Sequence, residues 1–399
     1  MHKHDWQIDA DELIAFTQQL VRIRSVYDAE EQTTEAEAAY AVADKMRAWG
    51  WDPQIVEVAP GRPNVIAVLD GGSPGPTLMF EGHTDVVTEG DLSEWSFDPY
   101  AAEIRDGRLL GRGSADMKAG VAAMMYAARA VELAGSFSGR IVVAALADEE
   151  GMMLGAKHLA QTDLAREVDG VVVCEPEDYE VCAVSKGAIR LKVTVDGKMA
   201  HGAMPQHGRN PIPVAARMIA RIADIQQKLQ EANGEHEHLG FDYLTTTVIH
   251  AGDADQMNVI PRACSFWVDV RTTPATDHAE LLFEIRDMVE ETALAGDVKA
   301  GVDVIDDRPP VDTPVDTPVV SALVEAHVNV MGAEPRFGGV PGTTDGTILV
   351  RDAALHSVVY GPGDKWIAHQ ADEWVGVEDI VNCAHIYAET ARIFLSSPR

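Results

Sequence analysis

The chain has 399 residues, of which 46% are hydrophobic and 24% are charged, so it can bury the cores of two or three domains. Its 32 basic and 64 acidic side chains give a formal charge of −32, which argues against binding to nucleic acid or to an anionic membrane surface. Four scattered cysteines, no apolar signal core near the N-terminus and no membrane-length apolar segment predict a cytoplasmic protein.

The first part of the chain alternates helical and strand-like patterns. Helical spacing at 10–25 and 34–50 comes first, and a long helical segment, 117–134, stands among short apolar runs. These runs are 64–69, 77–80, 141–147 and 171–174. Continuous apolar strands connected through helices predict an α/β domain whose mostly parallel central sheet is covered by helices.

The pattern changes at about residue 186. A strand of alternating polarity and a long helix are followed by two strands, a second helix and a last strand. This βαββαβ order predicts a separate α+β domain of residues 186–307. The proline-rich segment 308–318 leads back, so we expect a discontinuous domain of residues 1–185 and 308–399 with the second domain inserted in it.

Acidic and histidine residues follow the apolar runs of the first domain. They are His83 and Asp85 in EGHTD, Glu149 and Glu150 in DEE, Glu175 in CEPE and His369 in DKWIAH. Asp116 stands at the start of the long helix. Because ligands of open α/β sheets bind beyond the carboxyl ends of the strands, we expect these side chains to converge in one crevice.

Imidazole and carboxylate ligands suit zinc, cobalt or manganese. If Asp116 bridges two ions, His83 and Glu175 complete one site and Glu150 and His369 complete the other. Two ions roughly 3.5–4 Å apart activate water and polarise a carbonyl group. Glu149 is then free to move the proton of the water to a leaving nitrogen, and Asp85 is placed to accept the second ring N–H of His83.

Each motif alone is common in surface turns at strand ends. The segment GRGSAD also has some likeness to a dinucleotide-binding loop. That interpretation is rejected because Asp116 replaces the third glycine, and a carboxylate there would repel a pyrophosphate.

In combination and in order, these segments resemble the di-metal aminoacylase/metallopeptidase family that includes acetylornithine deacetylase, succinyl-diaminopimelate desuccinylase and glutamate carboxypeptidase. The resemblance covers nearly the whole chain through EGHTDVV, DGRLLGRGSADMKAG, DEEGMMLGAKHL, CEPE, GKMAHGAMPQHGRNPI, MNVIPRACSFWVDVR, GTTDG and GPGDKWIAHQADEWV. It implies Glu149 as general base and Asp85 as the residue that orients His83. The metal ligands that it implies are His83, Asp116, Glu150, Glu175 and His369.

The resemblance also assigns roles to the inserted domain. It implies a homodimer formed through this domain, with His201 of GKMAH reaching the partner's active site to hold the carbonyl oxygen of the substrate. Arg271 becomes a candidate clamp for a substrate carboxylate, and Asn258 a second substrate contact. Gly342 and Thr344 of GTTDG are expected to line the substrate pocket.

We therefore expect a hydrolase that cleaves the amide bond of an N-acyl amino acid with two divalent ions per chain, zinc first, with cobalt or manganese as alternatives. Glu175, where some members of the family have Asp, resembles the deacetylase and desuccinylase branch. One alternative is a metallo-carboxypeptidase or dipeptidase with the same site. Another is a non-catalytic protein that binds amino-acid derivatives. Such a protein would lack one of the metal-ligating residues or the general base. The acyl group is not indicated.

Overall fold

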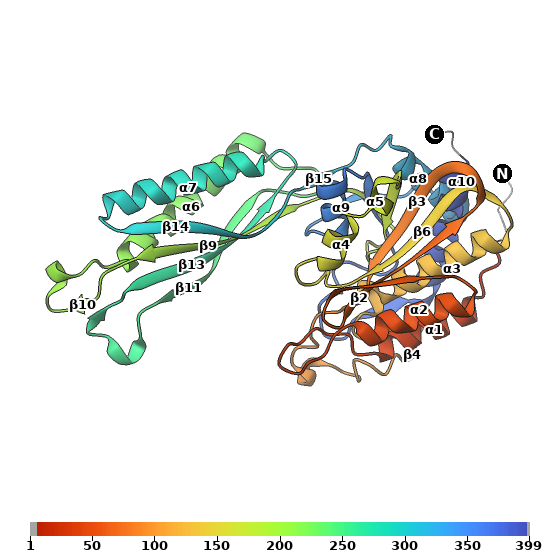
Figure 1. Cartoon of the computed structure of the whole chain (residues 1–399), viewed down its shortest axis with the longest axis horizontal. Helices are drawn as coiled ribbons and strands as arrows, with labels where there is room; N and C mark the ends of the chain where they lie inside the picture. Colours follow the sequence, from red (N-terminus) through yellow and green to blue (C-terminus); the bar gives the residue numbers. More distant parts are fainter. Residues whose placement is uncertain (1–5, 397–399) are drawn as a thin grey trace. The chain divides into compact units, whose positions relative to one another are not determined.

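The computed structural model describes residues 6–396 (Figure 1). Residues 1–5 lie outside the described residues. They begin the N-terminal segment in which we expected no apolar signal core. The chain divides into two compact units. The first consists of Met1–Ala183, Thr313–Gly339 and Thr344–Arg399, and the second of Val184–Asp312 and Val340–Thr343.

These limits differ by a few residues from those expected from the sequence. The short piece Val340–Thr343 groups with the second unit because Lys186 N–H donates to the carbonyl of Val340 (3.0 Å). Arg308 also donates to the Thr343 hydroxyl (3.3 Å). The proline-rich link is not wholly irregular either, because it contains a short strand, β15, which pairs with β8.

A nine-stranded sheet forms the centre of the first unit, in the order β1-β2-β6-β3-β7-β17-β8-β15, with β16 paired to β8. Its strands are β1 (Gln54–Ala59), β2 (Arg62–Asp70), β3 (Gly72–His83), β6 (Phe137–Leu146), β7 (Gly170–Val173), β8 (Val181–Ser185), β15 (Val311–Asp312), β16 (Phe337–Val340) and β17 (Ser357–Val359). The four central strands β6, β3, β7 and β17 are parallel to one another, whereas the other pairings, toward both edges, are antiparallel. The predicted parallel sheet is thus confirmed at its centre.

Helices cover both faces of this sheet (Figure 1). One group comprises α1 (Ala10–Arg22), α3 (Ala119–Leu133), α8 (Pro318–Met331) and α10 (Val377–Leu395), and the other α4 (Leu154–Leu159), α5 (Asp163–Arg166) and α9 (Asp345–Ala353). Gly170 of β7 lies against α8 and α10, while Val173, which points to the opposite face, lies near α9. The helix α2 (Ala36–Ala48) packs near β2, and a small sheet contains β4 (Ile104–Arg105), β5 (Arg108–Leu110) and β18 (Trp374–Gly376).

The second unit has the expected βαββαβ order. Its elements are β9 (Gly187–Asp196), α6 (Ile212–Asn233), β11 (Tyr243–Ala251), β13 (Ala263–Thr272), α7 (His278–Ala295) and β14 (Lys299–Arg308). They form an antiparallel sheet in the order β11-β13-β9-β14, and the buried faces of the strands pack on the two helices. The loops also pair, through β10 (Ala200–His201) and β12 (Val259–Ile260).

All four cysteines are buried and free. No helix in the part of the chain that the structure describes is long and apolar enough to cross a membrane.

Candidate metal centre

The side chains that the sequence analysis singled out in the first domain lie at the carboxyl ends of the parallel strands. His83 is the last residue of β3, Glu149 and Glu150 follow β6, and Glu175 follows β7. Asp116 lies in an irregular segment, Ser114–Lys118, directly before α3. Because β6, β3 and β7 are parallel, their ends meet at one edge of the sheet, which brings these groups together.

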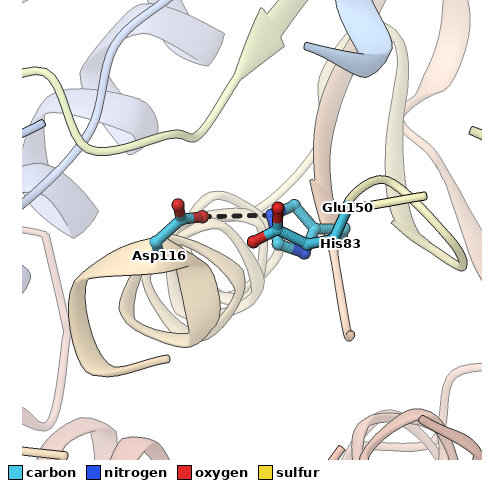
Figure 2. A group of neighbouring side chains, drawn as sticks. All are labelled: His83, Asp116 and Glu150. Carbon is cyan, nitrogen blue, oxygen red and sulfur yellow. Dashed lines mark hydrogen bonds and ion pairs between the residues drawn. The ribbon is translucent and has the colours of Figure 1, made fainter. Parts of the chain in front are cut away.

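Asp116 lies between two histidines. Its Oδ1 is 3.1 Å from Nε2 of His83, and its Oδ2 is 3.2 Å from Nε2 of His369. Glu150 contacts His369 (2.9 Å between Oε1 and Nε2), and Glu175 contacts His83 (3.4 Å). Figure 2 shows the Asp116 carboxylate pointing toward the His83 ring, with Glu150 beside them. One carboxylate thus reaches both histidines, each of which has a second carboxylate of its own.

Glu149 is also close to this group. The ligand atoms of His83, Glu149 and Glu175 lie within 4.8 Å of one another, as do those of His83, Asp116 and Glu150. Glu149 is therefore near enough to act on a molecule held among these side chains.

Asp85 lies beside the His83 ring, as expected, and approaches it with both its backbone carbonyl and its carboxylate. The ring Nδ1 of His83 bonds to the backbone carbonyl of Asp85 (2.9 Å), whereas the nearer carboxylate oxygen is 3.6 Å away. The carboxylate instead accepts hydrogen bonds from the backbone N–H groups of Glu149 (3.2 Å) and Glu150 (3.1 Å). Because β3 ends at His83, Asp85 no longer follows the alternation of a strand, and its backbone carbonyl is the nearer acceptor for the His83 ring.

The group is rich in carboxylates and is mostly buried, although His369 is exposed. Burial and the neighbouring Asp116 raise the pKa of Glu175 to about 8. Burial alone would lower the pKa of His83, but Glu175 and Asp116 outweigh it and raise that pKa well above its ordinary value. Hydrogen bonds to Asp116 and Glu150 raise the pKa of His369 to about 10. A cation placed among these groups would relieve this repulsion.

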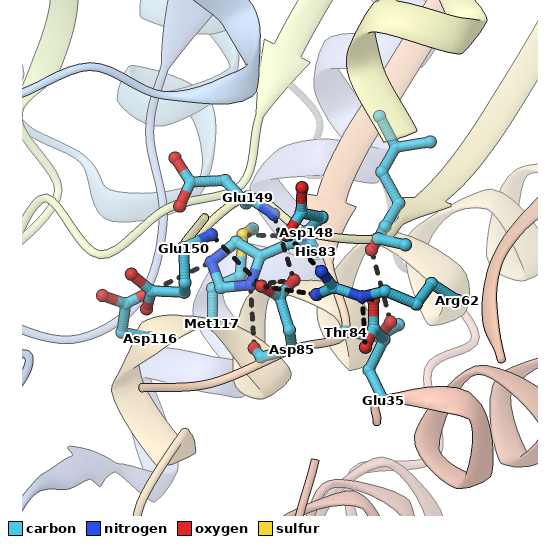
Figure 3. Close-up of polar contacts among 12 residues, drawn as sticks. Glu35, Arg62, His83, Thr84, Asp85, Asp116, Met117, Asp148, Glu149 and Glu150 are labelled. Carbon is cyan, nitrogen blue, oxygen red and sulfur yellow. Dashed lines mark hydrogen bonds and ion pairs between the residues drawn. The ribbon is translucent and has the colours of Figure 1, made fainter. Parts of the chain in front are cut away.

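Sequence reasoning missed several side chains that hold the group in place. Glu373 accepts hydrogen bonds from the backbone N–H groups of Ala115 (2.9 Å) and Asp116 (3.1 Å) and pairs with the buried Arg112. Only the segment AHQADEWV, already noted as a family motif, contained a signal for Glu373. Asp148 is the first residue of the quoted motif DEE, whereas Arg62, which lies beside Asp85 in Figure 3, stood outside every quoted motif.

Two further carboxyl groups, those of Glu81 and Asp345, lie near His83. Glu81 precedes it on the same face of β3, and Asp345 begins α9. Both are buried, and burial together with Glu175 raises the pKa of Glu81 to about 8. The two acids can therefore share a proton. Glu81 begins the quoted motif EGHTD and Asp345 stands in GTTDG, but the sequence analysis gave neither residue a role.

The remaining candidate residues lie in the second unit or beside it. His201 of β10 is exposed, and its Nδ1 accepts from the N–H of Ala203 (3.0 Å). The structure brings Asn258 next to it, because the carbonyl of Asn258 accepts from Gly202 (2.6 Å). Arg271 of β13 donates through Nε to Asp269 (2.9 Å).

The two residues of GTTDG fall on either side of a boundary between the units. Gly342 belongs to the second unit and Thr344 to the first, where Thr344 is buried before the first turn of α9. Neither position by itself identifies a contact with a substrate.

The donor set fits divalent metal ions. Two imidazole nitrogens and the carboxylates around them are ligands that zinc and its neighbours accept, and their negative charge matches that of a cation pair. On a sheet of this type such a centre defines a metal-dependent hydrolase. Residues 79–393 match the sequence profile of peptidase family M20/M25/M40, and the chain belongs to this family. It is accordingly a metal-dependent peptidase or amidase.

The individual proteins that are similar to this chain are named either as desuccinylases or as peptidases. A probable succinyl-diaminopimelate desuccinylase of Staphylococcus epidermidis is 27% identical over 92% of this chain and 94% of its own. A succinyl-diaminopimelate desuccinylase of Phenylobacterium zucineum is 31% identical over 79% of this chain and 83% of its own. Among solved structures, a tripeptidase of Staphylococcus aureus has the same fold, with a TM-score of 0.78, 22% identity and coverage of 98% of this chain and 100% of its own.

Proposed function

We propose that the protein hydrolyses the amide bond of an N-acyl amino acid with two divalent metal ions per chain. The observation that carries this proposal is the position of Asp116, whose two carboxylate oxygens face two different histidines at 3.1 and 3.2 Å. His83 and Glu175 would hold one ion with Asp116, and His369 and Glu150 the other. When bound, such a pair activates a water molecule and polarises the carbonyl group of the substrate.

Residues of the chain then move the protons. Glu149 removes a proton from the attacking water and delivers it to the leaving nitrogen, which needs a carboxylate within reach of both. Asp85 fixes Glu149 through its backbone N–H and fixes His83 through a carbonyl oxygen. Burial raises the pKa of Glu149 well above its ordinary value, which suits a group that must hold a proton between two steps.

The substrate class rests on chemistry and on relatives. An N-acyl amino acid carries a carboxylate, and a guanidinium group can bind it through two parallel hydrogen bonds, the role proposed for Arg271. Asn258, Gly342 and Thr344 are proposed as further substrate contacts, and His201 as the donor to the carbonyl oxygen. Two relatives named desuccinylases support an acyl group that is itself acidic.

Two further features of the protein belong to this proposal. We expect a homodimer formed through the second unit, as the family resemblance implies. We also expect the protein to work in the cytoplasm, since four buried free thiols suit a reducing compartment.

A metal-reconstitution experiment tests the proposal. Purified protein is treated with a chelator, loaded with zinc, cobalt or manganese, and assayed against N-succinyl, N-acetyl, N-formyl and N-benzoyl amino acids and dipeptides. We expect about two ions per chain, no activity in the metal-free protein and preferential hydrolysis of an N-acyl amino acid. Preferential cleavage of dipeptides would favour the peptidase alternative. Full activity without metal would overturn the mechanism.

A further inference from the structure

The turn that carries Glu149 and Glu150 is held by two carboxylates. Of its six backbone N–H groups, those of Glu149 and Glu150 donate to the Asp85 carboxylate at 3.2 and 3.1 Å. The next four, residues 151–154, donate to the carboxylate or the carbonyl oxygen of Asp148 at 2.6–3.3 Å. The position of the proposed base therefore depends on where Asp85 and Asp148 are held.

Arg62 is the cation between these carboxylates (Figure 3). It is 4% exposed, pairs with the Asp148 carboxylate and lies 3.9 Å from that of Asp85. Its Nε donates to Glu35 (2.8 Å), and the ring of Tyr27 lies 4.0 Å from its Cζ atom. Glu35 and Tyr27 thus fix the guanidinium, and the guanidinium fixes the two acids.

The same strand also closes the ends of the turn. Asn64, two residues after Arg62 on the same face of β2, accepts from the N–H of Ala147 (3.1 Å) and donates to the carbonyl of Gly155 (3.0 Å). A Cβ atom at Gly155 would lie 2.5 Å from the Asn64 side chain, so only glycine allows this approach. Residues of β2 therefore hold the turn at its ends and at its centre.

We infer that Arg62 is a positioning residue for catalysis, which keeps Glu149 in place through Asp148 and Asp85. The inference rests on the proposed role of Glu149 as the base. Without the guanidinium, three buried carboxylates would face one another uncompensated, and their repulsion would displace the turn. Displacement of a catalytic group by about 1 Å can lower a rate by about a hundredfold.

The first test measures backbone protection and needs no substrate. Hydrogen exchange of the zinc-loaded full chain is compared between wild type, Arg62→Met and Arg140→Met. Arg140 is the matched control because it lies near the start of β6, away from the turn that follows the end of this strand, and pairs there with Glu167 (2.8 Å). We expect faster exchange in the peptide that covers residues 147–155 for Arg62→Met alone. Unchanged exchange in this peptide would overturn the inference.

The second test separates positioning from general damage. At saturating zinc, Arg62→Met should lower kcat about tenfold or more, with KM changed less than about threefold, and Arg62→Lys should recover part of the loss. In a Glu149→Gln background, Arg62→Met should lower the residual kcat less than about twofold, because the group that it positions is gone. An equal loss in both backgrounds would contradict the inference.

These measurements also separate this inference from the proposed function. If Glu149→Gln keeps full activity, the proposed base is wrong and Arg62 cannot act through it, whatever the exchange data show. If Glu149→Gln is inactive but Arg62→Met is normal in exchange and kcat, the function stands and the inference fails. Should Arg62→Met not fold, Arg62→Lys is measured in its place, with smaller changes of the same sign expected.

Discussion

Glu149 and Glu150 are neighbours in sequence with different surroundings. Glu150 contacts His369 (2.9 Å), whereas Glu149 lies near His83 and Glu175. If Glu149 is the base, Glu149→Gln should lower kcat about a hundredfold or more with both metal ions retained. Glu150→Ala should instead weaken one metal site. Metal analysis and steady-state kinetics of the two variants measure this difference.

The division of roles is tested by comparing the turnover and the metal content of the two variants. Asp85 accepts the backbone N–H of each, so a change that merely loosens the turn would affect both alike. Equal metal loss in the two variants, with no selective loss of turnover in Glu149→Gln, would contradict the division of roles.

Glu89 links distant parts of the first unit and should make it sensitive to acid. Burial alone would raise the pKa of Glu89, but hydrogen bonds from Arg24, from its own backbone and from Tyr100 (2.8 Å) lower it to about 2. Because this pKa lies below the unfolded value of 4.5, the stabilisation is fully present above pH 4.5 and is lost as the pH falls toward 2.

Glu89→Gln should therefore destabilise the protein at pH 7 by about 2 kcal/mol, less than the full shift represents because solvent screens the partly exposed Arg24. The difference from wild type should shrink as the pH falls below 4.5. Urea unfolding at several pH values measures it, with Glu94→Gln on the exposed surface as control. A difference independent of pH would show that the ion pair is not its source.

At the scale of whole elements, most of the strands that position the site residues could be predicted from the sequence. The apolar runs before His83, Glu150 and Glu175 are short but continuous, so strands that end at or shortly before these residues followed directly from the pattern. The edge strand β1 and the strand β8, near the other edge, were missed. The supports of the site could not be found this way, since Arg62 lies 86 residues from Asp148, and Glu373 lies 257 residues from Asp116. Such contacts exist only in the folded chain.

Two loops that carry proposed ligands are joined by a partly buried lysine. The segment after β7 carries Glu175, and the segment after β17 carries His369. Between them, the Lys365 ammonium pairs with Glu177, contacts Glu180 (3.1 Å) and lies 3.8 Å from the sulfur of Cys182. Glu177, Glu180 and Cys182 could themselves hold a metal ion, but the ammonium group lies among them.

Lys365→Met should loosen both loops and lower the affinity for metal by about ten- to a hundredfold, the usual effect of removing a group that supports ligands. Zinc titration against a chelator of known affinity measures this. The control is Lys228→Met, which removes an exposed lysine paired with Glu284 (3.5 Å) in the second unit. Equal zinc affinities for Lys365→Met and wild type would mean that the backbone alone holds the two loops.

At the scale of the molecule, the sheet of the second unit has an exposed edge strand that is available for pairing with another chain. β11 is an end strand of its sheet and is mostly exposed along its length, including Val248 and Ile249. Exposed apolar edge strands of this length are commonly covered by another chain. A two-fold pairing of such edges would give the homodimer that the family resemblance implies.

A mixed dimer tests whether His201 serves the site of the partner subunit. His201→Ala and Glu149→Gln should each be nearly inactive as homodimers, for want of a donor to the carbonyl oxygen in one and of a base in the other. In a mixed dimer, one of the two sites combines an intact Glu149 with an intact His201 from the partner. Random exchange of equal amounts should therefore restore about a quarter of wild-type activity, because half of the dimers are mixed and each has one complete site. The mixture is measured after the subunits, carrying different affinity tags, have been unfolded and refolded together, with each variant refolded alone as control. Mixed dimers purified through both tags and still inactive would show that His201 does not act across the interface.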